Sequence, residues 1–166
     1  MKISEMKNNQ IPPFEIEDEK MRKLLSFYIH YAPTIESNTA ISVDENKLKS
    51  NWNKFFEDAK FSSFKIYNEN YKLSEEVFSK NQLGDNQILN RKNLSVVCKR
   101  KHKNEEDYEC ILRHIRNSIA HNNIYIVNAG NRKYILLEDY NKSKNITSRM
   151  LLSQTILSKL KRCIIQ

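Results

Sequence analysis

The sequence ILRHIRNSIAHNNIYI spans Ile111 to Ile126 and joins the longest helical pattern of this 166-residue chain to its clearest strand pattern. Before His121, apolar residues recur every three or four positions, which is the spacing of an amphipathic helix. From Ile124 onward, isoleucine, tyrosine and valine follow one another as they do in a β-strand. We therefore expect a helix over residues 104–121 that is followed at once by a strand.

This helix has two different faces at about 100° per residue. The face that we expect to meet the core holds large apolar side chains: Tyr108, Ile111, Leu112, Ile115 and Ile119. The opposite face holds polar groups and one small residue: Glu109, Arg113, Asn117, Ala120 and His121, with Arg116 at its edge. Because Ala120 is small, a partner can approach this polar face closely.

The same spacing predicts further amphipathic helices over residues 16–31, 44–61 and 148–165. Residues 62–82 are rich in aromatic side chains, and we expect one or two shorter helices there. Residues 94–98 form a short apolar run that fits either a strand or the start of a helix. A β-hairpin is predicted where the apolar runs 124–127 and 134–137 flank a turn at Gly130.

The composition favours helices over a β-sandwich or barrel. The chain has only 2 glycines and 3 prolines, and those β folds need many tight turns. We therefore expect a mainly α fold, a helical bundle with a small β-hairpin inserted before the last helix. The length suits one domain, so we assign residues 1–15 to an N-terminal arm and residues 16–166 to a single helical domain.

The charge and the cysteines bear on partners and location. The net charge of +8 favours a polyanionic partner such as RNA, although a lysine-rich composition alone would also produce it. Cys98, Cys110 and Cys163 lack C-x-x-C spacing, which indicates buried thiols in a reducing cytoplasm. No run of about 18 apolar residues is present, so we expect no membrane span and a cytoplasmic protein.

Neither a cofactor nor a metal is expected from the sequence. Gly84 and Gly130 stand alone, which excludes a phosphate-cradling glycine loop. No set of carboxylate, histidine and cysteine residues has the spacing of a metal site. These absences disfavour nucleotide-cofactor enzymes and metal-dependent nucleases.

Arg116, Asn117 and His121 are the candidate catalytic residues. A neutral imidazole can take the proton from a ribose 2′-OH, and an arginine can stabilise the negative charge that grows on the phosphorus centre. Asn117 lies one turn before His121, where its amide can orient the imidazole or bond a phosphate oxygen. Arginine and histidine near a helix end also serve structure alone, because the helix dipole favours cations there.

The stretch RHIRNSIAHNN resembles the signature of the HEPN superfamily, in which an arginine and a polar residue precede a histidine by four to six intervening positions. The resemblance covers roughly residues 104–163. It implies a helical bundle that forms a homodimer with facing motif helices. It also implies a metal-independent endoribonuclease of phage defence or of a toxin–antitoxin pair, leaving a 2′,3′-cyclic phosphate. Arg116 would stabilise the transition state, His121 would be the acid and base, and Asn117 would support them.

The resemblance leaves several points open. A toxin subgroup has a tyrosine two residues after the histidine, where this chain has Asn123. We expect RNA-backbone contacts from Arg113 and from the basic cluster Lys99, Arg100, Lys101 and Lys103, although such a cluster also suits a solvated loop. His114 is expected to be a bystander. An antitoxin or sensor protein is a possible partner. The alternative functions are a HEPN-type module that binds nucleic acid, nucleotide or protein without cleaving, and a purely structural dimer.

Overall fold

The computed structural model describes residues 1–12, 15–30 and 45–165, and its centre is a five-stranded mixed sheet. The strands are β1 Ser63–Tyr67, β2 Ser95–Lys99, β3 Ile124–Ala129, β4 Arg132–Tyr140 and β5 Ile146–Ser153. Their order across the sheet is β1-β2-β5-β4-β3. β1 and β2 are parallel, whereas every other neighbouring pair is antiparallel.

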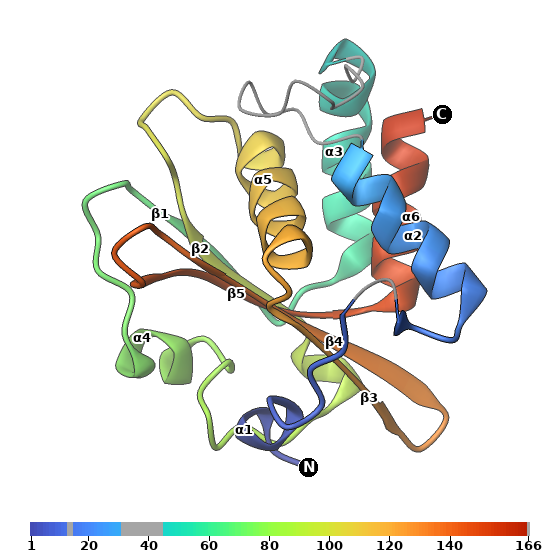
Figure 1. Ribbon diagram of the computed structural model, residues 1–166. Helices are drawn as coiled ribbons and strands as arrows, with labels where there is room; N and C mark the ends of the chain where they lie inside the picture. Colours follow the sequence, from blue (N-terminus) through green and yellow to red (C-terminus); the bar gives the residue numbers. More distant parts are fainter. Residues whose placement is uncertain (13–14, 31–44, 166) are drawn as a thin grey trace.

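Helices cover both faces of this sheet, so the chain forms three layers (Figure 1). One face carries the longer helices, α2 Glu19–His30, α3 Glu45–Ala59, α5 Asp107–Ala120 and α6 Gln154–Ile165. The other face carries the short helices α1 Ile3–Met6 and α4 Glu75–Lys80, and a 3-10 turn over Arg91–Asn93 precedes β2.

Alternate residues of the strands supply two separate cores. Val96, Leu137 and Met150 point to the layer of long helices, while Leu136 and Leu151 belong to the smaller core under α1 and α4. This alternation is the expected geometry of a strand, in which successive side chains point to opposite faces. Because both faces are covered, the runs 134–137 of β4 and 150–152 of β5 are apolar without alternating with polar residues, while Glu138, Asp139, Ser148 and Arg149 of the same two strands are buried polar groups.

The prediction of a mainly α fold with only a small hairpin is therefore wrong. Helix makes up 44% and strand 24% of the structure. The largest single error concerns residues 148–153, which were predicted to open the last helix but form most of β5. Met150, Leu151 and Leu152 are good helix formers, yet here they pair with Val96, Ser95 and neighbouring residues of β4. Long-range strand pairing outweighs local helix propensity at this place.

The low glycine content was misleading because other residues make the turns. Positive φ angles occur at Asn122 (60°) and Lys144 (64°), as well as at Gly130 (63°). Residues 62–82 likewise hold β1 and only one short helix, α4. The hairpin around Gly130 is present, and its second strand is longer than expected because β4 extends to Tyr140. The predicted helix limits at Tyr31 and Asp44 fall outside the described residues.

The first twelve residues lie against the sheet. Ile3 and Met6 are fully buried in the smaller core, and an isolated bridge joins Gln10 to Tyr125 of β3. Lys7 also forms an ion pair with the buried Glu138, at 3.2 Å. Among the described residues, no helix combines the length and the apolar character that crossing a membrane would require.

Candidate active site at the end of helix α5

Helix α5 is the element that carries the predicted motif, and its core face is as expected. Ile111, Leu112, Ile115 and Ile119 are all buried. A second flank is buried as well, because α5 packs on β2 and β4 of the sheet in addition to α2. That flank includes His114, which is fully buried.

The end of α5 fixes His121 in place. His121 is the C-cap residue, and Asn122 adopts a positive φ of 60° directly after it. The backbone N–H of Asn123 donates to Ser118 O at 2.8 Å, and that of Asn122 donates to Ile119 O at 3.1 Å. These two bonds form the Schellman motif, in which a left-handed residue closes a helix. These bonds define the backbone around His121, whose side chain lies exposed at the corner between helix and strand.

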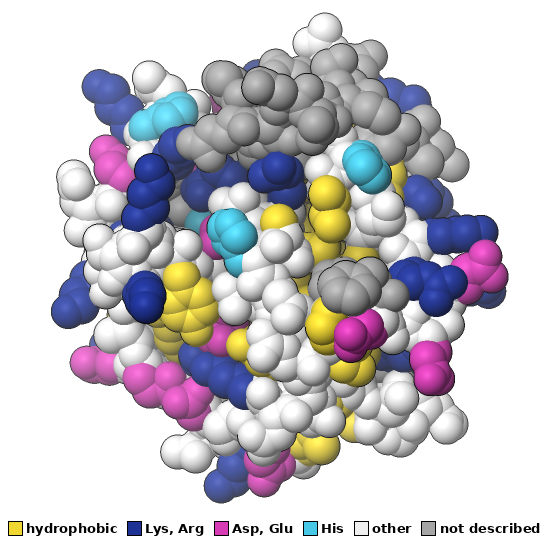
Figure 2. Space-filling model, viewed as in Figure 1, with side chains coloured by type: hydrophobic (Ala, Val, Ile, Leu, Met, Phe, Trp, Pro, Cys, Tyr) yellow, Lys and Arg dark blue, Asp and Glu magenta, His cyan; other side chains and the backbone are white. Residues whose placement is uncertain are grey.

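His121 lines a cleft of about 400 Å³. Asn117, one turn earlier on α5, also lines it, together with Tyr140 of β4. Basic residues outnumber acidic ones along its walls. The basic residues are Lys99, Arg100, Lys101, Arg113 and Lys142, and the acidic residues are Glu69 and Asp139. Figure 2 shows histidine, lysine and arginine side chains at several places on one face of the molecule, with acidic side chains among them. The cleft therefore offers an acid–base group beside a surface that attracts an anion.

Arg116 does not line this cleft. It is not among the described residues that line it, which agrees with its position about 140° from His121 around an ideal helix. Its Nε atom is buried and has no hydrogen-bond partner among the described residues. Within one copy of the chain, only His121 of the predicted pair Arg116 and His121 lines this cleft.

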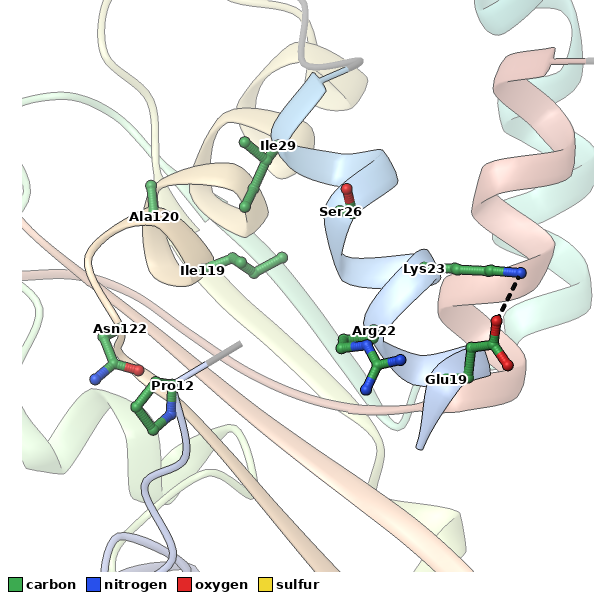
Figure 3. Close-up of a pocket in the computed structure, with 9 residues that line it drawn as sticks. All are labelled: Pro12, Glu19, Arg22, Lys23, Ser26, Ile29, Ile119, Ala120 and Asn122. Atoms are coloured by element: carbon green, nitrogen blue, oxygen red, sulfur yellow. Dashed lines mark ion pairs between the residues drawn. The ribbon is translucent and has the colours of Figure 1, made fainter. Parts of the chain in front are cut away.

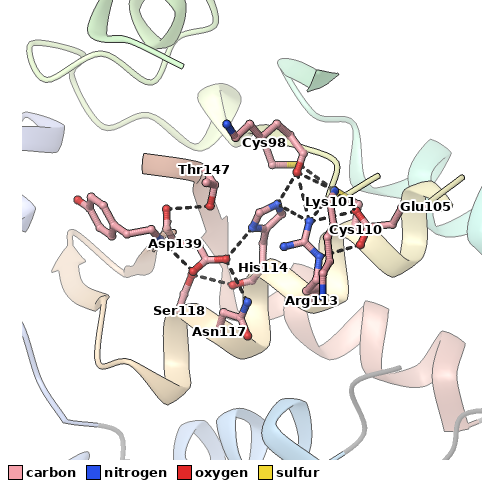
Figure 4. A network of polar contacts seen from close by, with 12 residues as sticks. Cys98, Lys101, Glu105, Cys110, Arg113, His114, Asn117, Ser118, Asp139 and Thr147 are labelled. Atoms are coloured by element: carbon pink, nitrogen blue, oxygen red, sulfur yellow. Dashed lines mark hydrogen bonds and ion pairs between the residues drawn. The ribbon is translucent and has the colours of Figure 1, made fainter. Parts of the chain in front are cut away.

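A buried polar network supports the wall of the cleft (Figure 4). His114 Nδ1 lies 2.8 Å from Asp139 Oδ2, and its Nε2 lies 2.8 Å from the carbonyl oxygen of Lys99. Asp139 Oδ2 also accepts a hydrogen bond from Asn117 Nδ2 at 3.3 Å. The carboxylate therefore connects the buried His114 to Asn117 in the cleft.

This network makes His114 a charged group. Burial alone would lower its pKa, but the hydrogen bond with Asp139 opposes this, and the pKa is raised from 6.5 to about 9. Both ring nitrogens then donate, one to a carboxylate and one to a carbonyl oxygen. The expected bystander is thus an imidazolium that joins α5 to β2 and β4.

The predicted RNA-binding residues differ in their surroundings. The guanidinium of Arg113 is mostly buried and pairs with Glu105 at 2.7 Å, an ion pair between two groups that burial would otherwise penalise. Arg100 pairs with Asp107 at 2.7 Å. Lys101 and Lys103 lie exposed in the loop between β2 and α5. In this conformation, the arginines organise the loop.

Lys99 has a similar supporting contact, since its Nζ donates to the backbone oxygen of Tyr71 at 3.3 Å. Sequence reasoning missed the cleft residues Asp139, Tyr140 and Lys142, which come from β4 and the loop after it. No local pattern marks them, because strand pairing alone brings them beside α5.

Cys98, Cys110 and His114 are the residues best able to hold a metal among those described, since their ligand atoms all lie within 4.8 Å of one another. The structure favours a different state for them. Without a metal, the hydrogen bond with Cys98 and burial raise the pKa of the Cys110 thiol, and a metal would have to displace that proton because it binds the thiolate. His114 also has both nitrogens engaged. A metal would have to displace the imidazolium network.

Comparison with protein families gives the context for this helix. The sequence matches the family described as HEPN pEK499 p136 over residues 5–165. The chain belongs to this HEPN family. The resemblance noted at Arg116, Asn117 and His121 is thus part of a match that includes the first hundred residues, where no motif was visible. Comparisons with curated proteins and with solved structures gave no match.

Proposed function

We propose that this HEPN protein is a metal-independent endoribonuclease whose cleavage centre includes His121. The imidazole removes the proton from a ribose 2′-OH, and the 2′-oxygen attacks the adjacent phosphorus. The bond from phosphorus to the 5′-oxygen breaks, and that oxygen receives a proton. The products are a 2′,3′-cyclic phosphate and a 5′-OH. We propose phage defence or a toxin–antitoxin pair as its setting, with an antitoxin or sensor protein as a further partner.

The observation that supports this proposal is the position of His121 in the basic cleft. The imidazole is exposed at the corner after α5, Asn117 lies beside it, and Lys101 and Lys142 line the same walls. Lysine side chains there would hold the phosphates on either side of the bond to be cleaved. The buried Asp139 accepts a hydrogen bond from Asn117, which supports the position of the Asn117 side chain beside the proposed reaction centre.

The position of Arg116 supports a homodimer as the active form. Arg116 and His121 lie on different sides of α5. If a second copy packed against this end of α5, its Arg116 and His121 would come close to those of the first copy. A hollow of about 710 Å³ lies beside the motif between α2 and the end of α5. Its walls include Ile29, Ile119 and the small Ala120 (Figure 3), a surface that another helix can approach closely. The second His121 would then act as the acid.

The test is cleavage of labelled RNA in the presence and absence of EDTA, with both product ends mapped. We expect cleavage that EDTA does not affect and a 2′,3′-cyclic phosphate at the new end. His121→Ala should lower the rate by about 10² to 10⁴, the contribution of a general acid–base group. His30→Ala is the matched control, because His30 is likewise exposed at the end of a helix, and it should cleave as the wild type does.

The homodimer is tested with two inactive variants. Arg116→Ala and His121→Ala should each be inactive alone, and because the composite centre would need these side chains from both copies, an excess of either variant should also lower the activity of the wild type by forming mixed dimers. A folded wild-type protein that binds RNA but leaves it intact would contradict the nuclease and favour the non-cleaving binding module. Variants that lose only thermal stability would favour a structural motif.

A further inference from the structure

A second hollow of about 420 Å³ adjoins the cleft that holds His121. Lys99 and Tyr140 line both. The chain from Glu69 to Leu73 also passes along the two hollows in turn. The two hollows thus form one path along the surface, leading away from His121 over the ends of β4 and β5.

The lining of this second hollow is basic. Lys72, Lys99, Lys144 and Arg149 contribute to it, and no carboxylate does among the described lining residues. Arg149 is buried and pairs with Glu138 at 2.8 Å, so the three lysines supply the charge that an incoming anion would meet. The first cleft, by contrast, includes Glu69 and Asp139. The positive potential therefore extends beyond His121 into the second hollow.

An aromatic platform lies in the same hollow. Tyr71 is 38% exposed, although it is a large aromatic residue. Its ring stacks on that of Tyr67, with centroids 4.2 Å apart and planes at 13°. Tyr67 is the last residue of β1, and the Lys99 side chain holds the Tyr71 backbone oxygen. One side of the Tyr71 ring is thus supported by a residue of the sheet.

We propose that the second hollow binds the nucleotide next to the cleaved phosphodiester, with its base stacked on Tyr71 and its phosphate near Lys99 and Lys72. The substrate of this HEPN protein is then single-stranded RNA. Stacking needs a base whose face is free, whereas the bases of a duplex cover one another. Basic grooves combined with stacking aromatics are the general means of holding single strands. Cleavage of the RNA beside this nucleotide rests on the proposed function, but binding of single-stranded RNA in the second hollow does not.

The experiment measures binding in the His121→Ala background, where the RNA stays intact. Fluorescence anisotropy with a labelled single-stranded RNA and with the same sequence as a duplex gives the two affinities. We expect tighter binding of the single strand, and Tyr71→Leu should weaken it about tenfold, the effect of losing one stacked base. Tyr71→Phe keeps the ring and should bind as the parent does.

Phe56→Leu is the matched control, because Phe56 is 39% exposed but lies on α3, among Phe61 and Phe64. It should leave the affinity unchanged. Equal affinity for single strand and duplex, or an unchanged affinity in Tyr71→Leu, would overturn the inference even if the wild type cleaves RNA. If the wild type binds single strands through Tyr71 without cutting them, the inference stands and the proposed nuclease fails.

Discussion

Helix α5 carries two histidines, two turns apart, whose surroundings are opposite. His114 is fully buried between Asp139 and the carbonyl oxygen of Lys99. His121 is exposed at the helix end and lines an open basic cleft. In the sequence His114 directly follows Arg113 and His121 follows Arg116 by five residues, so residue type alone does not distinguish them. The difference teaches that partners and access, rather than residue type, decide which imidazole can exchange a proton with a substrate.

The two regions are also connected. Asp139 accepts hydrogen bonds from His114 and from Asn117, so the buried charge stabilises the wall on which the exposed site stands. Changes in the buried region should therefore act first on the free energy of unfolding. Changes at the exposed end should act on cleavage with little effect on folding.

The largest effect on stability is expected from Asp139→Asn. The substitution keeps the shape but leaves the buried imidazolium without its counter-charge, and breaking a buried pair in this way costs about 3 kcal/mol. Urea unfolding measures the change. Asp18→Asn is the matched control, since Asp18 also pairs with a cation, Lys133 at 2.6 Å, but is over a third exposed. It should cost less than about 1 kcal/mol. Equal, small losses of stability in both variants would contradict the conclusion that a charged His114 joins α5 to β2 and β4.

The pH dependence of unfolding should show the same buried charge. The pKa of His114 is about 9 in the folded chain against an ordinary 6.5, so between these pH values the folded state binds the additional proton. The stabilisation is complete below pH 6.5 and is lost as the pH rises through about 9. The free energy of unfolding should fall by about 3 kcal/mol over that range.

Urea titrations at a series of pH values measure this slope. Asp139→Asn removes the main interaction that raises the pKa, and its profile should be flatter than that of the wild type. A wild-type profile that is flat between pH 6.5 and 9 would mean that His114 is neutral in the folded chain.

The sequence alone correctly predicted which residues of α5 face the core. It did not predict which residues of distant strands come together in the sheet. The periodicity of Ile111, Ile115 and Ile119 located the core face of α5 because helix geometry is local. Asp139 entered the site through the pairing of β4 with β5, where it lies opposite Ser148. Register of this kind depends on residues far apart in the chain. Met150 and Leu151 were assigned to a helix for the same reason, since a strand buried on both faces has no two-residue period.

The smallest expected effects belong to Asn117, the residue that joins the two regions. Its Nδ2 donates to Asp139 at 3.3 Å, and the side chain lines the cleft one turn before His121. Asn117→Ala should lower the free energy of unfolding by about 1 kcal/mol, the value of one hydrogen bond. If Asn117 also positions His121 or a phosphate oxygen, the variant should in addition cleave RNA about tenfold more slowly, with the loss in kcat rather than in KM.

Asn51→Ala separates these two contributions. Asn51 also donates one side-chain hydrogen bond, to Cys163 O at 3.3 Å, but it lies on α3 outside the His121 cleft. Its variant should lose a similar amount of stability and keep the wild-type cleavage rate. If Asn117→Ala and Asn51→Ala behave alike in both measurements, Asn117 is a structural residue only. The exposed region would then consist of His121 and the lysines that line its cleft, without a direct link to the buried charge behind it.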